Sequence, residues 1–264
     1  MHLRIAHTTT FTYDHLISEA YTEMRLRPLD AGGQRCLGFS LATEPRDEVL
    51  QYTDRFGNDV RHFDFIQPHQ TVRVSAVSEV LTVDRLPLEP LALSPLDEFD
   101  YRMATEYVPL TEPLARFAAA HAVPGDAPAT VWACLHALYG RLAYTKGATD
   151  VTTTADEALA LGQGVCQDFA HILLAVYRSL GLPARYVSGY LYNHGRDAAS
   201  HAWVDVYLPG QGWLSLDPTH NGEQTDHYVR VAVGRDYADV PPTRGVFTGN
   251  AHETLAVEVT VTAL

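Results

Sequence analysis

The spacing of apolar residues changes once along the chain, at a proline-rich stretch from Leu86 to Pro95. Upstream, apolar and polar residues alternate, for example over residues 3–13 and 72–82, which is the period of half-buried β-strands. Downstream, apolar residues recur every three or four positions, which is the period of helices. The three prolines of the stretch exclude a helix and disfavour a central strand. We therefore expect a domain boundary here, with residues 1–90 in an N-terminal domain and residues 91–264 in a second domain.

The expected fold class is α+β. The N-terminal domain is predicted to be an antiparallel β-sandwich, because short alternating segments follow one another between turn-forming residues. Besides the two long segments, strand composition is found in residues 36–41, 49–52 and 60–65. Helices of the second domain are predicted over residues 114–121 and 131–142 and after Thr154, which begins a capping-box pattern. A C-terminal segment, residues 255–261, has strand composition and either returns to the first domain or extends the second.

Cys166 is the residue on which a functional interpretation of the second domain depends. It follows a turn that contains Gly162 and Gly164, and it begins a segment of helical periodicity that ends at Gly181. The first turn of a helix has unpaired N–H groups and the positive end of the helix dipole, so it favours a thiolate over a thiol. From this pattern alone, Cys166 is either a nucleophile or a small buried hydrophobic residue.

A thiolate nucleophile needs an imidazole to protonate the leaving group and a further group to orient that imidazole. His201, in a predicted strand over residues 200–207, and Asp217, near the end of another over residues 213–219, are the candidates. A hairpin turn joins the two strands, and neighbouring strands lie about 4.8 Å apart, so the two side chains are within hydrogen-bond reach. With residues 184–192, we expect a three-stranded antiparallel sheet packed against the Cys166 helix.

These residues resemble the motifs of the transglutaminase-like superfamily, the papain-related cysteine enzymes in which Cys, His and Asp occur in this order. The matching pieces are Gly164-Val165-Cys166, Gly181–Arg185, His201-Ala202-Trp203 and Asp217-Pro218-Thr219. His7–Tyr13 and Gly234–Pro242 are similar to the bacterial branch with an extra N-terminal β domain, so the resemblance covers nearly the whole chain. It implies a papain-like or transglutaminase-like core in which a catalytic helix packs on an antiparallel sheet.

The predicted function is a cysteine-dependent acyl-transfer enzyme acting on the amide or peptide bonds of a peptide, a protein or a small molecule. Cys166 would attack the carbonyl, His201 would protonate the departing amine, and Asp217 would orient the imidazole. The thioester would pass to water or to a primary amine, and we expect water, because no lysine-binding feature is visible. The backbone N–H of Cys166 is the expected oxyanion donor, with Gln163 or Tyr144 as a second one.

Two other functions are open on the sequence. A metal site could draw on His201, Asp205, His220 and Cys166, although no metal-binding motif with the usual spacing is present. The same fold could instead serve as a non-catalytic protein-interaction module. A binding surface, however, has no physical need for Cys, His and Asp in this order.

Composition restricts the partners and the location. The formal net charge of −13, from 19 basic and 32 acidic residues, argues against nucleic-acid binding, which depends on basic surfaces. No apolar run approaches the roughly 20 residues that span a bilayer, and the N-terminus has no signal-peptide pattern. Three cysteines without a paired spacing fit a reducing compartment. We therefore expect a cytoplasmic protein that has no disulfide and needs no cofactor, metal, membrane or nucleic-acid partner.

Overall fold

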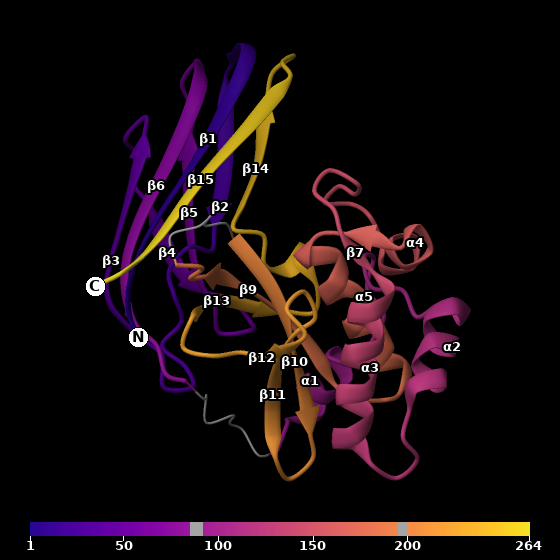
Figure 1. Cartoon of the computed structure of the whole chain (residues 1–264). Coiled ribbons are helices and arrows are strands. Elements are labelled where there is room, and N and C mark those ends of the chain that lie inside the picture. Colours follow the sequence, from indigo (N-terminus) through magenta and orange to yellow (C-terminus); the bar gives the residue numbers. More distant parts are fainter. Residues whose placement is uncertain (85–91, 195–199) are drawn as a thin grey trace.

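The computed structural model describes residues 1–84, 92–194 and 200–264. Most of the predicted boundary stretch therefore lies outside the described residues, as does part of the loop expected after residue 192. The described chain is of mixed α+β class and forms two lobes (Figure 1). One lobe consists of β-sheets, and the other combines a sheet with helices.

Two antiparallel sheets make up the N-terminal lobe, as predicted. The first has the order β15-β1-β6-β3, with the bounds Glu253–Ala263, His2–Ile17, His69–Leu81 and Arg35–Glu44. The second has the order β14-β2-β5-β4, with the bounds Thr243–Thr248, Glu19–Met24, Asp59–Phe65 and Leu50–Thr53. Side chains from both sheets form one apolar core that includes Phe11, Phe63 and Val74. The sandwich is held by this shared core, since each sheet presents its alternating apolar face to the other.

The second lobe contains a five-stranded antiparallel sheet in the order β12-β11-β10-β9-β13. The bounds are Gly222–Glu223, Gly212–Asp217, Ser200–Leu208, Ala184–Leu191 and Tyr228–Gly234. The three predicted strands are β9, β10 and β11. The strands β12 and β13 were not predicted. Every residue of β13 is buried. Such a strand is covered on both faces and lacks the polar alternation by which half-buried strands are detected.

The helices of the second lobe surround one central helix, α5 (Cys166–Ser179). The other helices are α1 (Pro95–Asp100), α2 (Glu112–His121), α3 (Ala127–Arg141), α4 (Ala155–Leu161) and the 3₁₀ helix η1 (Tyr237–Asp239). Residues 167–178 of α5 are all buried, because α2, α3 and α4 contact it on one side and β9 and β10 on the other. In the described ranges, no helix combines the length and the apolar character needed to cross a membrane.

The C-terminal strands belong to the N-terminal lobe. β15 pairs with β1 from Leu3↔Ala263 to Tyr13↔Glu253, and β14 pairs with β2. This corrects the expected division of the chain, which assigned all of residues 91–264 to the second domain. The pairing joins segments more than 200 residues apart, and neither strand carries a local pattern that specifies its partner.

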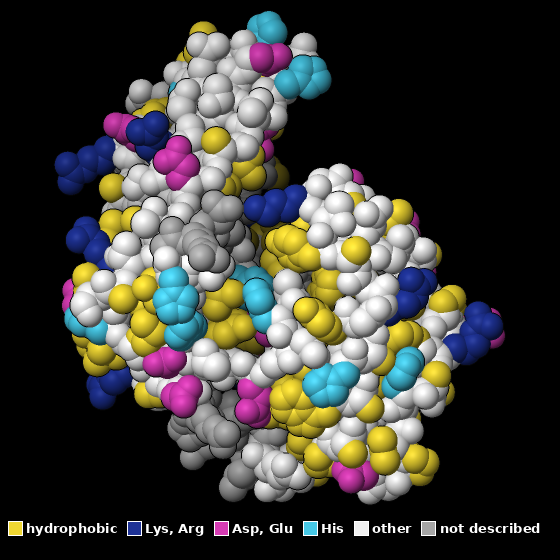
Figure 2. Space-filling model, viewed as in Figure 1, with side chains coloured by type: hydrophobic (Ala, Val, Ile, Leu, Met, Phe, Trp, Pro, Cys, Tyr) yellow, Lys and Arg dark blue, Asp and Glu magenta, His cyan; other side chains and the backbone are white. Residues whose placement is uncertain are grey.

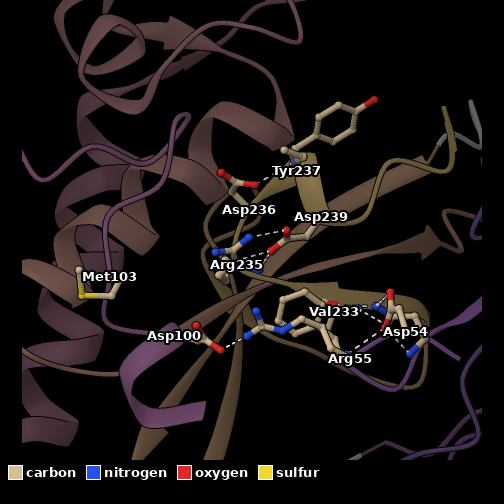
Figure 3. A network of polar contacts seen from close by, with 12 residues as sticks. Asp54, Arg55, Asp100, Met103, Val233, Arg235, Asp236, Tyr237 and Asp239 are labelled. Carbon is tan, nitrogen blue, oxygen red and sulfur yellow. Dashed lines mark hydrogen bonds and ion pairs between the residues drawn. The ribbon is translucent and has the colours of Figure 1, made fainter. Parts of the chain in front are cut away.

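Side-chain amides of the N-terminal lobe complete the outer edge of β13. Gln34 accepts a hydrogen bond from the Arg230 N–H at 2.8 Å and donates one to the Arg230 carbonyl at 2.9 Å. Asn58 does the same with Val233, at 2.8 Å in both directions. Figure 3 shows two ion pairs in the same region, Arg55 with Asp100 and Arg235 with Asp239. All four of these hydrogen bonds, made by the Gln34 and Asn58 side chains, are buried. They therefore hold the two lobes in a fixed relation.

Candidate active site

Cys166 is the first residue of α5, as predicted, and it is half-buried. Helix α4 ends at Leu161 and is capped by Gly162, whose φ of +71° is the left-handed conformation that favours glycine. Only glycine fits at position 164, because a Cβ there would lie 2.5 Å from the Asp168 carboxylate. That carboxylate folds back to accept a hydrogen bond from the Val165 N–H at 2.7 Å. The glycines and Asp168 thus fix the turn that presents the thiol.

His201 and Asp217 meet as predicted. They lie on the adjacent strands β10 and β11, and His201 Nε2 donates to Asp217 Oδ2 at 2.7 Å. The imidazole is also hydrogen-bonded to Cys166, for which its other nitrogen, Nδ1, is available. The structure therefore brings together all three side chains that the sequence nominated, in the order thiol, imidazole and carboxylate.

The electrostatics of this cluster favour a charged imidazole. Burial opposes protonation of His201, but its hydrogen bonds to Asp217 and Cys166 and their negative charges outweigh burial and raise the pKa to about 10. For Asp217, burial favours the neutral acid, but the hydrogen bonds and charges of His201 and His220 hold the pKa well below its usual range. At neutral pH the cluster contains an imidazolium that lies between the Cys166 sulfur and a carboxylate.

Sequence reasoning missed two further partners of Asp217. His220 Nδ1 and the Tyr228 hydroxyl each lie 2.7 Å from Asp217 Oδ2. The other oxygen, Oδ1, accepts from the backbone N–H groups of Thr219 at 2.7 Å and His220 at 3.2 Å. The contact of His220 could have been inferred from the sequence, because His220 follows Asp217 by only three residues. The contact of Tyr228 could not, because β13 was not predicted.

Two cavities meet at the thiol, and Cys166 and His201 line both. The first, about 380 Å³ and here called the cleft, is lined also by Tyr144, Lys146 and His220. The second, about 250 Å³, lies between the lobes. Figure 2 shows the surface hollowed between the lobes, with hydrophobic and histidine side chains around the hollow.

The two expected second oxyanion donors have different positions. The short parallel pair β7 (Ala143–Tyr144) and β8 (Gln163–Gly164) places Tyr144 beside the start of α5, and Tyr144 lines the cleft. Burial raises the pKa of Tyr144, as do the negative charges of Cys166 and Asp217, so its hydroxyl keeps its proton at neutral pH. The Gln163 side chain lines neither cavity. Tyr144 is therefore the better placed of the two.

The residues proposed for a metal site divide into two groups. Within the described ranges, His201, Asp217 and His220 have potential ligand atoms within 4.8 Å of one another. These atoms are, however, already hydrogen-bonded to each other. Asp205 is not part of this group and is paired with Arg230 and Arg185. The four-residue set suggested by the sequence is therefore not brought together.

The aromatic residues near the site have structural roles. Trp203 is buried, and its indole N–H donates to Ser215 and Gln224 at 3.0 Å. His171 is also buried, and burial lowers its pKa to about 3, aided by the charge of Arg178. Its Nε2 accepts a hydrogen bond from the Tyr237 N–H at 3.2 Å. As predicted, neither residue takes part in the thiol cluster.

Comparisons with known proteins agree with the two lobes. Residues 3–81 match the bacterial transglutaminase-like N-terminal region, and residues 118–218, which include Cys166, His201 and Asp217, match the transglutaminase-like superfamily. An uncharacterized protein of Mycobacterium leprae is 34% identical over 278 residues, which cover 99% of each chain. The chain belongs to the transglutaminase-like superfamily, and the resemblance seen in its motifs is confirmed.

Two further similarities bear on chemistry. The crystal structure of a Cytophaga hutchinsonii protein, provisionally described as a cysteine protease, is 25% identical with a TM-score of 0.80 and covers 100% of this chain and 91% of that one. A segment of 68 residues is 43% identical to protein-glutamine gamma-glutamyltransferase of Pseudomonas aeruginosa, but it covers 22% of this chain and 10% of that enzyme. The fold is thus that of cysteine-dependent acyltransferases and proteases.

Proposed function

We propose that this protein is a cysteine-dependent acyltransferase that cleaves amide or peptide bonds through a thioester at Cys166. One observation carries the proposal. A thiol at the start of a helix is hydrogen-bonded to an imidazole whose pKa is raised to about 10, and that imidazole is bound to a buried carboxylate. A non-catalytic interaction module would not require this arrangement of charges.

The steps follow from the positions of the groups. The Cys166 thiolate attacks the substrate carbonyl, and the His201 imidazolium gives its proton to the departing amine. His201, now neutral, then accepts a proton from the water that hydrolyses the thioester, and the thiolate is restored. Asp217 keeps Nε2 of the imidazole occupied, so that the other nitrogen faces the thiol.

The oxyanion formed in each step needs hydrogen-bond donors. The backbone N–H of Cys166 has no acceptor within its helix, because it belongs to the first turn of α5. The Tyr144 hydroxyl lines the cleft beside it and is the proposed second donor. Both donors belong to elements fixed by the short β7–β8 pair, so they are preorganised for the charge that develops on the oxygen.

We propose water as the main acyl acceptor, because the cavity walls do not favour a cationic amine. Among the described residues, no Asp or Glu side chain lines either cavity, whereas Lys146 lines the cleft. An ammonium group approaching the thioester would therefore meet a like charge and no carboxylate. The acidity of the chain as a whole, with a net charge of −13, is not concentrated in these walls.

The test is to incubate the protein with a panel of peptide amides, with and without a primary amine, and to identify the products by mass spectrometry. We expect free acids as the main product and no product from a Cys166→Ala variant. Cys36→Ala is the matched control, because Cys36 is a half-buried cysteine on β3, outside both cavities. Full activity of Cys166→Ala would disprove the mechanism, and predominantly amine-linked product would disprove the preference for water.

A further inference from the structure

One face of strand β1 changes its role twice along its length. Leu3 and Ile5 belong to the apolar core of the second lobe, whereas Phe11 belongs to the core of the sandwich. Between them, on the same face of the strand, lie the polar residues His7 and Thr9. This interruption of an otherwise apolar face marks the place where the two lobes separate and a cavity opens.

We call this space the interlobe cavity. It has a volume of about 250 Å³. One wall is formed by the N-terminal lobe, through His7 and Thr9 of β1 and Leu255 and Val257 of β15. The opposite wall comes from α5, β9 and β10 and includes Cys166 and His201. The N-terminal lobe therefore forms part of a space that reaches the reactive thiol.

The part of the interlobe cavity that the structure describes has no charged side chain in its lining apart from the Cys166–His201 pair. His7 is hydrogen-bonded to the Tyr190 hydroxyl at 2.8 Å and to the Thr9 hydroxyl at 3.0 Å, and burial lowers its pKa to about 4. It is therefore uncharged at neutral pH. Among the described residues, no Asp, Glu, Lys or Arg lines this cavity, in contrast to the cleft with its Lys146.

The wall contributed by β15 is apolar and accessible. Val257 pairs with Thr9, and Leu255 pairs with Phe11, so both side chains lie on the face of the sheet that carries His7. Their exposed fractions are 48% and 53%. When an apolar ligand covers accessible aliphatic side chains in a cavity, apolar surface is removed from water, which favours binding.

The wall opposite β15 is held in place by the segment that follows β13. Arg235 and Asp239 form an ion pair at 2.9 Å, and Tyr237 between them lines the interlobe cavity. Figure 3 shows the Tyr237 ring pointing away from this ion pair. The Tyr237 backbone is in turn fixed by His171. The cavity is therefore built from anchored elements on both sides.

We propose that the interlobe cavity binds an uncharged, apolar side chain of the substrate, next to the amide bond that Cys166 attacks. This inference rests on the proposed function and adds the substrate class to it. The size is appropriate, because cavities of about 150 Å³ already hold a benzene molecule, so 250 Å³ accommodates a single leucine or phenylalanine side chain. A charged side chain would lose its hydration there, and the one charged imidazole of the described lining, His201, is already engaged with Asp217 and Cys166.

The first experiment compares kcat/KM for peptide amides in which the residue on either side of the scissile bond is Leu, Phe, Asp or Lys. On one side of the bond, we expect the wild-type protein to prefer Leu or Phe to the charged residues by about 10- to 100-fold. Val257→Glu should lower the Leu preference over Lys at least about tenfold, because it places a carboxylate in the cavity wall. Ala256→Glu is the matched control, since Ala256 is exposed on the same strand but on the opposite face. It should leave the preference within about twofold of wild type.

A second measurement does not need turnover. The rate of alkylation at Cys166 is followed by mass spectrometry with two chloroacetamides, one bearing an isobutyl group and one a carboxymethyl group. We expect the isobutyl reagent to react faster with the wild type, and Val257→Glu but not Ala256→Glu to reduce this advantage. If no peptide is cleaved, the proposed function fails while the alkylation ratios still decide the role of the cavity. Identical ratios in the wild type and in Val257→Glu would overturn the inference.

Discussion

Two aspartates in the second sheet are equally buried but have different partners. Asp205 on β10 and Asp217 on β11 are both fully inaccessible to solvent. Asp205 is bound by the guanidinium groups of Arg230 and Arg185, the latter at 2.8 Å. Asp217 is bound by two imidazoles and a phenol. Both carboxyl groups have lowered pKa values, because these partners outweigh the effect of burial.

The difference between the partners separates a structural carboxylate from a functional one. A guanidinium keeps its charge throughout the physiological range, so the Asp205 cluster has one protonation state and serves only to hold β9, β10 and β13 together. An imidazole can give up its proton, so the Asp217 cluster can take part in proton transfer. Burial therefore does not identify a functional carboxylate, but the chemistry of its donors does.

The largest expected effect is on activity, from Asp217→Ala. This change releases the His201 imidazole from its orienting group, and we expect kcat to fall by roughly 10³- to 10⁴-fold. Asp217→Asn should be nearly as damaging, because both oxygens of Asp217 accept hydrogen bonds and leave no acceptor for an amide NH₂ group. Steady-state kinetics on one peptide amide measures both. Wild-type kcat in Asp217→Ala would mean that another group orients His201.

Asp205→Ala should instead affect stability. It leaves the buried guanidinium of Arg230 without its carboxylate, and breaking a buried ion pair in this way costs about 3–5 kcal/mol. Urea unfolding measures the loss, and kcat per folded molecule should stay close to wild type. Glu112→Gln, which removes an exposed ion pair with Arg116, is the control and should have no measurable effect. A large loss of kcat without a loss of stability would contradict the structural role of Asp205.

The pH dependence of stability should come from the His201–Asp217 cluster and not from the Asp205 cluster. The pKa of His201 is raised from about 6.5 in the unfolded chain to about 10 in the folded protein. Its contribution is therefore complete below pH 6.5 and is lost as pH rises through about 10, with a slope of up to about 1.4 kcal/mol per pH unit. His201→Gln should remove this slope. Asp205→Ala should keep it, because the hydrogen bonds and charges that raise the His201 pKa come from Asp217 and Cys166. Equal slopes for the wild type and His201→Gln would show that His201 does not carry the charge.

The sequence was sufficient for the residues whose local pattern reflects their position. The capping residues and glycines around Cys166 place it at a helix start, and the hairpin turn after β10 places His201 beside Asp217. Alternation of apolar residues likewise identified β1 and β6 of the sandwich, and strand composition identified β3, β4 and β5, whereas β2 was not predicted. In each case the relevant neighbours are close along the chain or follow from strand geometry.

Other features depend on contacts between distant segments and have no local signal. β15 joins β1 across more than 200 residues, and β13 is buried on both faces, so neither pairing could be predicted. Tyr228 reaches Asp217 only because β13 joins the sheet beside β9. The polar residues His7 and Thr9 gave no functional signal until the lobes were seen to separate there.

The smallest expected effect concerns the donors that Asp217 receives besides His201. Tyr228→Phe removes one of three donors from Oδ2 at a buried position, so the negative charge of Asp217 loses part of its compensation. A hydrogen bond to a charged group contributes about 1.5–3 kcal/mol, but His201 and His220 still compensate the same oxygen, so we expect a loss of about tenfold or less in kcat. His220→Gln should have a smaller effect still, because the His220 side chain is 51% exposed and water can replace it. The kcat values of the two single variants and the double variant measure this coupling. If Tyr228→Phe alone lowered kcat as far as Asp217→Ala, the phenol would have to orient His201 or contact the substrate directly.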